Sequence, residues 1–349
     1  MKSETNSKAR PRGAVGRGFR FRMESSAREI SGKSANIPNQ KANFQSQPKV
    51  PSEPSRGVGG MKCSVCSKRA FFKGPLGPFC EEHLVESVRE RARKEIEGVN
   101  EKILLAVSGG KDSLVLMDVM AHIYDKDKLV AVTIVEGAGK YRLKEVEVAR
   151  AFAQKLGIRY YYVTFKELYG LTLDEMVSRG KLSPCTYCGV FRRRALEHLA
   201  EKEGAIVATG HTLDDEAHTA LLNFLRGSWE DILKLNSRVR LKPLRKVYEV
   251  EVTAYAKVIG VPFQDEECPY IVTRPSLRAR LRERLFELEE ERPMTLLKWR
   301  EALERLGTPE RKISYCKLCG YPTSPDREIC RACELAKEVG ARILKRVKP

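Results

Sequence analysis

Residues 102–113 read KILLAVSGGKDS, a short apolar run followed at once by two glycines, a lysine and an aspartate. The run 102–107 is typical of a buried strand, and residues 112–124 have the apolar spacing of a helix. Paired glycines allow a tight turn between the two, and the free N–H groups at a helix start attract anions. The sequence therefore predicts a strand, a phosphate-binding loop and a helix in direct succession.

The loop carries several groups that suit a nucleoside triphosphate. Its lysine offers a positive charge, its serines offer hydroxyls, and its aspartate is suited to hold Mg²⁺ together with the pyrophosphate. The spacing differs from those of the Walker loop and of the dinucleotide fingerprint, which disfavours both kinds of site. The candidate residues are Ser108, Gly109, Gly110, Lys111, Asp112 and Ser113.

The strand–helix alternation continues beyond the loop. Further strands are expected at 129–135, 158–164 and 205–209, and further helices at 142–157, 189–203 and 212–226. This rhythm predicts an α/β fold with a doubly wound, Rossmann-like parallel sheet. The expected parts are a disordered basic tail at 1–60, small metal modules at 61–84 and 311–349, a linker helix at 85–101, a catalytic domain at 102–272 and a helical region at 273–310. Met61 directly precedes the first cysteine, so the tail can also be read as an over-extended start.

The charge balance favours a polyanionic partner. The net charge is +18, and the body beyond residue 60 still carries +10 of it. Nucleic acid is the commonest partner of such a surface. We find no run of eighteen apolar residues and no apolar stretch near the N-terminus, so we expect neither a membrane span nor a secretory signal, and a cytoplasmic location.

Two groups of cysteines lie near the ends of the chain. The first is Cys63, Cys66, Cys80 and His83, and the second is Cys316, Cys319, Cys330 and Cys333. Paired knuckles of this kind supply four soft ligands for a tetrahedral Zn²⁺, which small modules need in order to fold. We therefore predict two zinc ions. The expected roles of the zinc ions are to stabilise the two ends of the fold and to help to form a tRNA-binding surface, and the two roles are compatible.

Three further cysteines lie in the middle of the sequence. Cys185 and Cys188 form a PCTYC motif before a basic helix, and Cys268 precedes a proline. Three thiolates suit an iron–sulfur cubane with one open iron. They equally suit a redox disulfide with a persulfide, or a third zinc with a bound water. The residues alone leave these three readings open.

The loop 108–113 resembles the PP-loop of the ATP pyrophosphatases, enzymes that cleave ATP between its α- and β-phosphates and adenylate a substrate oxygen. The resemblance implies that backbone at Ala106 and at Thr133 to Val135 holds the adenine. It also implies a second nucleotide contact in the loop after the fourth strand, at Gly210, Asp214 and Asp215, through Mg²⁺. An alternative role for these carboxylates is to cap the next helix.

Taken together, the PP-loop, the PCxxC motif and the later Cys-Pro resemble the tRNA 2-thiolation enzymes of TtcA and TtuA type, and specifically the uridine-thiolating branch with a zinc module at each end. The resemblance implies a [4Fe–4S] cluster on Cys185, Cys188 and Cys268. It adds Arg192 and Asp215 as catalytic residues, although Arg192 replaces a lysine that is common in relatives. Phosphate contacts with tRNA, or a solvated helix face, are the alternatives for residues 192–194.

The expected function is that of a tRNA-uridine 2-sulfurtransferase that consumes ATP. The resemblance implies a ubiquitin-like sulfur carrier with a C-terminal thiocarboxylate, or free sulfide, as donor; relatives are often homodimers. The motif NFLRG at 223–227 resembles wobble-uridine enzymes, whereas LDDEA at 213–217 resembles T-loop enzymes. The rival hypotheses are another PP-loop ligase or amidotransferase acting on tRNA, and a non-catalytic zinc protein that binds RNA.

Overall fold

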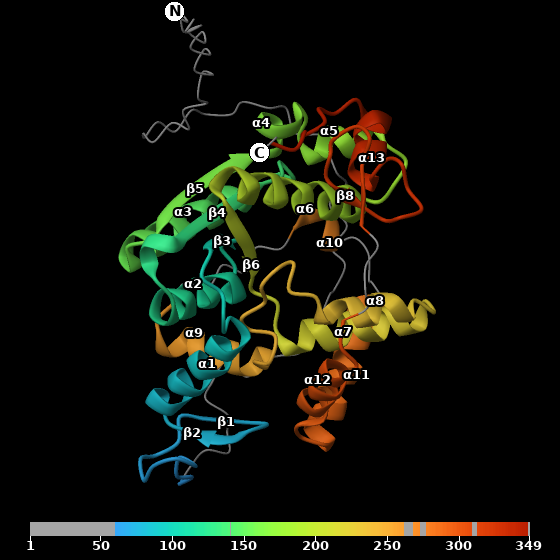
Figure 1. Ribbon diagram of the computed structural model, residues 1–349. Coiled ribbons are helices and arrows are strands. Elements are labelled where there is room, and N and C mark those ends of the chain that lie inside the picture. Colours follow the sequence, from blue (N-terminus) through green and yellow to red (C-terminus); the bar gives the residue numbers. More distant parts are fainter. Residues whose placement is uncertain (1–59, 140, 262–267, 273–276, 309–312, 348–349) are drawn as a thin grey trace, which may run out of the picture. The chain divides into compact units, whose positions relative to one another are not determined.

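The computed structural model describes residues 60–139, 141–261, 268–272, 277–308 and 313–347 (Figure 1). All of them belong to the unit Gln47–Pro349. The tail expected at 1–60 lies, apart from Gly60, outside the described residues. None of the helices in the described part combines the length and apolar character that crossing a bilayer needs.

The centre of the structure is a parallel sheet of four strands. These are β3 (Lys102–Ala106), β4 (Leu129–Val135), β5 (Arg159–Thr164) and β6 (Ala205–Thr209), in the order β5-β4-β3-β6. The central strand β3 runs parallel to both of its neighbours. Leu104, for example, lies opposite Val130 of β4 on one side and Val207 of β6 on the other. The doubly wound α/β prediction is confirmed, and the four strands lie where the apolar runs placed them.

Helices cover both faces of the sheet because alternate strand residues are apolar on each side. Ile103 and Leu105 belong to one core, which is completed by α1 (Glu81–Glu95), α2 (Lys111–Ile123), α3 (Tyr141–Leu156) and α9 (Glu249–Val258). Leu104 and Val132 belong to the other, which is completed by α4 (Phe165–Tyr169), α5 (Leu173–Arg179), α6 (Pro184–Glu203) and α13 (Arg331–Val339).

Two helices begin earlier than the sequence pattern predicted. We expected one from 189, but α6 starts at Pro184, because the Ser183 hydroxyl accepts a hydrogen bond from the Thr186 N–H and Pro184 fills the first helical position. The linker helix predicted from 85 starts at Glu81. Cys185 and Cys188 therefore lie within the helix, one turn apart near its start, rather than before it.

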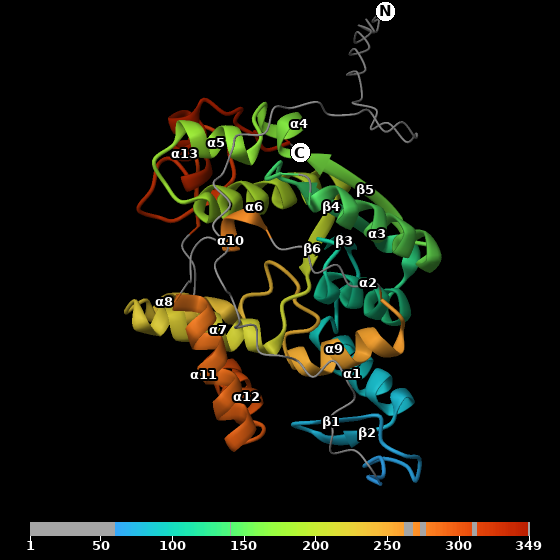
Figure 2. The same ribbon diagram turned by 180° about the vertical axis from the view of Figure 1, so that it is seen from behind.

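The remaining elements are helices and two short hairpins outside the central sheet. A smaller core joins α7 (Leu213–Leu225) to α12 (Thr295–Arg305), and α11 (Leu277–Glu291) packs beside them. The short elements are α8 (Trp229–Leu233), α10 (Pro269–Val272) and the hairpins β1–β2 (Phe72–Gly74, Gly77–Phe79) and β7–β8 (Ser314–Tyr315, Pro322–Thr323). The two helices expected within 274–306 are α11 and α12. Both views show α13 beside α5 and α6 (Figures 1 and 2).

Candidate active site

The loop between β3 and α2 is closed around one hydroxyl. Ser113 Oγ accepts hydrogen bonds from the N–H groups of Ser108, at 3.1 Å, and Gly109, at 3.2 Å, and donates to the Gly110 carbonyl at 2.8 Å. Ser108 Oγ lies 3.2 Å from Ser113 Oγ and accepts from the Gly110 N–H. The two serines thus hold the loop in shape, in addition to the phosphate contacts expected of them.

Gly109 is required by its surroundings. Its φ of +92° lies in the left-handed region, and a Cβ there would lie 2.5 Å from Glu145 Cβ and 2.6 Å from the Glu145 carbonyl oxygen. The loop is therefore pressed against α3. Gly110 meets no such obstacle, since its nearest neighbour would be Ser108 Oγ at 3.5 Å.

The loop after β6 packs against the start of α2. A Cβ on Gly210 would lie 2.8 Å from the Asp112 carbonyl oxygen, so only glycine allows this approach. The sequence-predicted nucleotide loops thus meet at the carboxyl ends of β3 and β6. In an open parallel sheet, ligands bind in the crevice at this edge, where the chain reverses its winding.

The two aspartates of this second loop have different contacts. Asp215 forms a capping box with Thr212: its carboxylate accepts from the Thr212 N–H at 3.0 Å, as the capping alternative anticipated. Asp214 accepts from the Glu249 N–H at 2.7 Å. Burial, together with the charges of Glu249 and Asp215, raises the pKa of Asp214 to about 7.

One cluster of charged side chains beside the loop contains four carboxylates and two cations. The carboxylates are Asp112, Asp214, Asp215 and Glu249, and the cations are Lys111 and Arg282. Lys111 Nζ lies 2.6 Å from Asp112 Oδ1 and 3.3 Å from Glu249 Oε1. Glu249 is also paired with Arg282. Burial raises the pKa of Asp112, and the charges of Glu249 and Asp215 act in the same direction. An excess of close carboxylates beside a phosphate loop is suited to a divalent cation.

The positions proposed for adenine lie at the carboxyl ends of the two central strands. Thr133 is fully buried and donates its hydroxyl to the Val107 carbonyl at 2.7 Å, which ties the two strand ends together. Ala106 ends β3 and Val135 ends β4. The structure therefore locates all three beside the loop.

The cysteine pair lies at the start of α6. Cys185 is exposed, and Cys188, one turn later, is half-buried with its sulfur 2.9 Å from Arg192 Nη2. Burial raises the pKa of Cys188 to about 11, with further contributions from the nearby charges of Glu136 and Cys268, while Arg192 opposes them. Cys268, immediately before α10, is thus brought near Cys188 from a distant part of the chain.

The three central thiols do not converge as the two terminal ligand sets do. Within the described residues, the ligand sets whose donor atoms all lie within 4.8 Å of one another are the two terminal ones, and the central thiols are not among them. A single zinc needs its ligands to converge in this way, whereas the ligands of a cubane bind different irons. All three sulfurs belong to free thiols.

Two charged residues near these sulfurs, Glu136 and Arg142, were not predicted from the sequence. Glu136 follows β4 directly, is 2% exposed, and pairs with Arg142 at 3.1 Å and with Arg192 at 2.5 Å. Arg142 is itself hydrogen-bonded to the Ser108 carbonyl at 3.1 Å. The available signal was the location of Glu136 at the carboxyl end of a central strand, where functional side chains of this fold gather.

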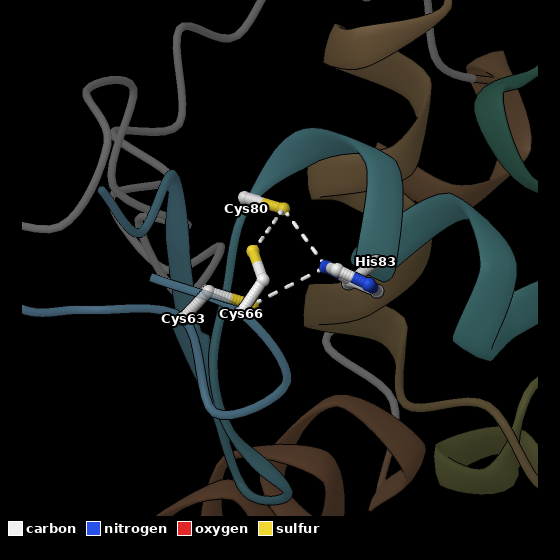
Figure 3. A group of neighbouring side chains, drawn as sticks. All are labelled: Cys63, Cys66, Cys80 and His83. Carbon is white, nitrogen blue, oxygen red and sulfur yellow. Dashed lines mark hydrogen bonds between the residues drawn. The ribbon is translucent and has the colours of Figure 1, made fainter. Parts of the chain in front are cut away.

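The first terminal ligand set is already preformed (Figure 3). His83 Nδ1 lies 3.2 Å from Cys80 Sγ and 3.6 Å from Cys63 Sγ, and Cys66 Sγ lies 3.9 Å from Cys80 Sγ. Cys80 caps α1 and His83 lies in its first turn. These four atoms could hold a metal ion, as the spacing predicted.

The second terminal set is buried completely. Cys316 Sγ lies 3.8 Å from Cys333 Sγ, and Cys319 Sγ lies 3.6 Å from Cys330 Sγ. The four sulfurs could likewise hold a metal ion. Arg194 of α6 donates to Cys330 Sγ at 3.6 Å, so the helix that starts with Cys185 and Cys188 also contacts this metal module.

These features define the class. Residues 83–289 match the family model described as PP-loop domain, so the chain is an α/β protein with a PP-loop. It is 32% identical to the tRNA 2-thiolation protein NcsA of Haloferax volcanii, over 80% of this chain and 100% of that protein. It is 33% identical to the tRNA-5-methyluridine(54) 2-sulfurtransferase of Pyrococcus horikoshii, over 81% and 97%. The chain therefore belongs to the family of PP-loop tRNA 2-thiolation proteins.

A solved structure of the same family is similar over nearly its whole length. The U34-tRNA thiolase NcsA from Methanococcus maripaludis, solved with its [4Fe–4S] cluster, has a TM-score of 0.71 and 29% identity. The match covers 83% of this chain and 99% of that one. The resemblance predicted from the loop and cysteine motifs is confirmed.

Proposed function

We propose that the protein is an ATP-dependent tRNA-uridine 2-sulfurtransferase. The observation that carries the proposal is the shared edge of the sheet, where the PP-loop and Cys188 are joined through Arg142, Glu136 and Arg192. An activating nucleotide and a sulfur site are thus held within one set of contacts. The family membership supports the same activity.

The reaction divides into two balanced steps. In the first, O2 of a uridine attacks the α-phosphorus of ATP, the bond to the β-phosphate breaks, pyrophosphate leaves, and N3 gives up its proton. In the second, hydrosulfide attacks C2, the C2–O bond breaks, AMP leaves with that oxygen, and the sulfur-bound proton returns to N3. Activation by adenylation replaces one difficult substitution with two easier ones.

The residues of the loop would bind and orient ATP. Lys111 and the N–H groups at the start of α2 would contact phosphate oxygens, and Asp112, with Asp214 or Asp215, would hold Mg²⁺. Backbone at Ala106 and Thr133–Val135 would hold the adenine. Because four carboxylates surround one lysine and one arginine, bound Mg²⁺ would relieve the repulsion among them.

The central thiols would hold the cluster. Cys185, Cys188 and Cys268 would be its three ligands, and a bound [4Fe–4S] cluster would supply one open iron position for a sulfur ligand. Arg192 would donate a hydrogen bond to the Cys188 sulfur. The two terminal sets would each bind Zn²⁺, for which three thiolates with one imidazole, or four thiolates, are suitable ligands.

The partners follow from the same chemistry. The basic body would bind tRNA in the cytoplasm, and a carrier with a C-terminal thiocarboxylate, or free sulfide, would supply sulfur. A homodimer is part of the proposal, on the resemblance to relatives. The proposed target is the wobble uridine, supported by the NFLRG motif and by the named target of the Methanococcus thiolase. The T-loop uridine is the second candidate, because the LDDEA motif and the Pyrococcus relative favour it.

The decisive experiment is an anaerobic reaction of the reconstituted protein with tRNA, ATP and sulfide, followed by nucleoside analysis. We expect 2-thiouridine, and mapping of the modified nucleotide distinguishes position 34 from position 54. A tRNA ligase or amidotransferase would stay active in Cys268→Ala, whereas thiolation would be lost. A protein that only binds RNA would release no pyrophosphate from ATP. A reaction without any 2-thiouridine would overturn the proposal.

A further inference from the structure

A buried carboxylate lies at the centre of a chain of contacts between the nucleotide loop and the cysteine pair. Glu136 stands one residue beyond β4 and is 2% exposed. Its Oε2 accepts from Arg142 Nε of α3 at 3.1 Å, and its Oε1 pairs with Arg192 Nη2 of α6 at 2.5 Å. Each carboxylate oxygen therefore holds an arginine from a different helix.

The guanidinium groups of the two arginines also reach the two halves of the candidate site. Arg142 Nη1 donates to the Ser108 carbonyl at 3.1 Å, within the PP-loop. Arg192 Nη2 donates to Cys188 Sγ at 2.9 Å. The contacts thus run without a break from a backbone atom of the PP-loop to a sulfur of the cysteine pair.

The two arginines depend on Glu136 to different degrees. The Arg142 side chain is 9% exposed and is also paired with Glu145, so it keeps an anionic partner when Glu136 is neutralised. The Arg192 side chain is 39% exposed. A long, partly exposed side chain loses entropy when it is held in one rotamer, and a charge-assisted bond to a buried carboxylate is strong enough to offset that loss.

We propose that Glu136 is a positioning residue for the sulfur-transfer step, because it holds the Arg192 guanidinium against Cys188. This inference rests on the proposed function. Glu136 contacts neither the nucleotide loop nor a sulfur directly, so it acts through the two arginines. Loss of its charge weakens the hold on Arg192, while Arg142 keeps its bond to Glu145 and continues to support Ser108, so the second half-reaction suffers more than the first.

The test compares two half-reactions in the reconstituted holoprotein. In Glu136→Gln, RNA-dependent pyrophosphate release stays within about threefold of wild type, while 2-thiouridine formation falls by about 10- to 100-fold, the usual effect of removing a residue that orients a metal ligand. The matched control is Glu147→Gln, which removes the same charge from an exposed position on α3 and leaves both rates unchanged.

A spectroscopic measurement separates positioning from a merely structural role. Hydrogen bonds to cluster sulfurs set the reduction potential. Glu136→Gln and Arg192→Gln shift the midpoint potential of the cluster in the same direction, and Glu147→Gln does not. The double variant Glu136→Gln/Arg192→Gln loses no more thiolation activity than Arg192→Gln alone, because each substitution breaks the same Glu136–Arg192 pair.

The inference fails if pyrophosphate release and thiolation fall in parallel, if the potential is unchanged, or if the two losses add. Should Glu136→Gln not fold, Glu136→Asp keeps the charge but shortens the side chain, and it must show the same uncoupling in milder form. A wild-type protein that forms no 2-thiouridine refutes the proposed function, and the shift in potential still decides whether Glu136 positions Arg192.

Discussion

The sharpest steric constraint in the PP-loop is Gly109. In Gly109→Ala, the new Cβ collides with the Glu145 carbonyl oxygen, 2.6 Å away, so the loop must move. A misplacement of about 1 Å in an active site can lower the reaction rate on the order of 100-fold. We expect the loop movement to weaken ATP binding as well, with the affinity measured by calorimetry falling at least about tenfold. Gly98→Ala is the matched control, since Gly98 has a φ of +80° but open space around it. Equal ATP affinity in the two variants would contradict this account of the loop.

A second prediction at the residue scale concerns His198 on α6. Burial, with nearby positive charge, lowers its pKa from 6.5 to about 4, and its Nδ1 lies 3.0 Å from the Tyr321 hydroxyl. At pH values between about 4 and 6.5, His198 is protonated in the unfolded chain but neutral in the folded protein. The contribution of His198 to stability is therefore complete above pH 6.5 and is lost as the pH falls toward 4.

The measurement is thermal unfolding of wild type and His198→Gln from pH 8 to pH 4, at constant zinc. The difference in midpoint between the two proteins should be constant above pH 6.5 and should change in favour of the variant below it. A difference that does not vary with pH would show that His198 titrates normally in the folded protein.

Side chains whose chemistry is fixed by identity and spacing could be predicted from the sequence. The PP-loop residues and both terminal ligand sets are local patterns, and the structure brings each set together. The pairing of Glu136 with Arg192 and that of Glu249 with Lys111 could not be predicted, because each joins distant parts of the chain. Lys111 and Glu249, for example, are 138 positions apart. No spacing rule reports such a contact before the sheet order is known.

At the scale of elements, the strands were predictable because their apolar runs are continuous, as sheets covered on both faces require. Helix α9 was missed. Its sequence EVEVTAYAKV alternates β-branched and polar residues, which is a strand-like pattern. Contacts with α1 and α2 override that preference, since Val252, Ala256 and Tyr255 are buried in the core that they share.

Helix α6 connects the cysteine pair to the C-terminal metal module. The Arg194 guanidinium lies 4.1 Å from the centre of the Tyr321 ring, the Tyr321 hydroxyl donates to Glu201 at 2.8 Å, and the Tyr187 hydroxyl donates to Glu338 at 2.7 Å. Small modules of this kind need a metal to fold, so we expect these contacts to be released when the four cysteines cannot bind the proposed metal.

We therefore expect Cys333→Ser to accelerate amide hydrogen exchange across residues 194–203, while β3 keeps its protection. Exchange measured by mass spectrometry checks this. His83→Ala is the control variant, because it removes one ligand from the other metal set, which is built on α1. Unchanged exchange in α6 of Cys333→Ser would mean that the module is docked without supporting the helix.

At the scale of the whole molecule, the net charge of +18 predicts RNA binding that weakens with salt. We expect the body to carry this property, since residues 61–349 retain +10. A protein starting at Met61 should keep its 2-thiouridine yield, and the slope of log affinity against log salt should change by less than about one. Filter binding over a salt series measures the slope. A large fall in the yield or in the slope would instead show that the N-terminal segment contributes to tRNA binding as a basic arm.

The uneven accessibility of the ten cysteines gives the molecule a built-in label site. Cys185 is exposed, whereas the other nine are buried or half-buried. We therefore expect a bulky maleimide to react with a single position when the proposed cluster is not bound. Once that thiol is engaged as a ligand, the reagent should find nothing to modify. The labelled fraction then counts the empty molecules in any preparation, which would let catalytic rates be expressed per loaded enzyme.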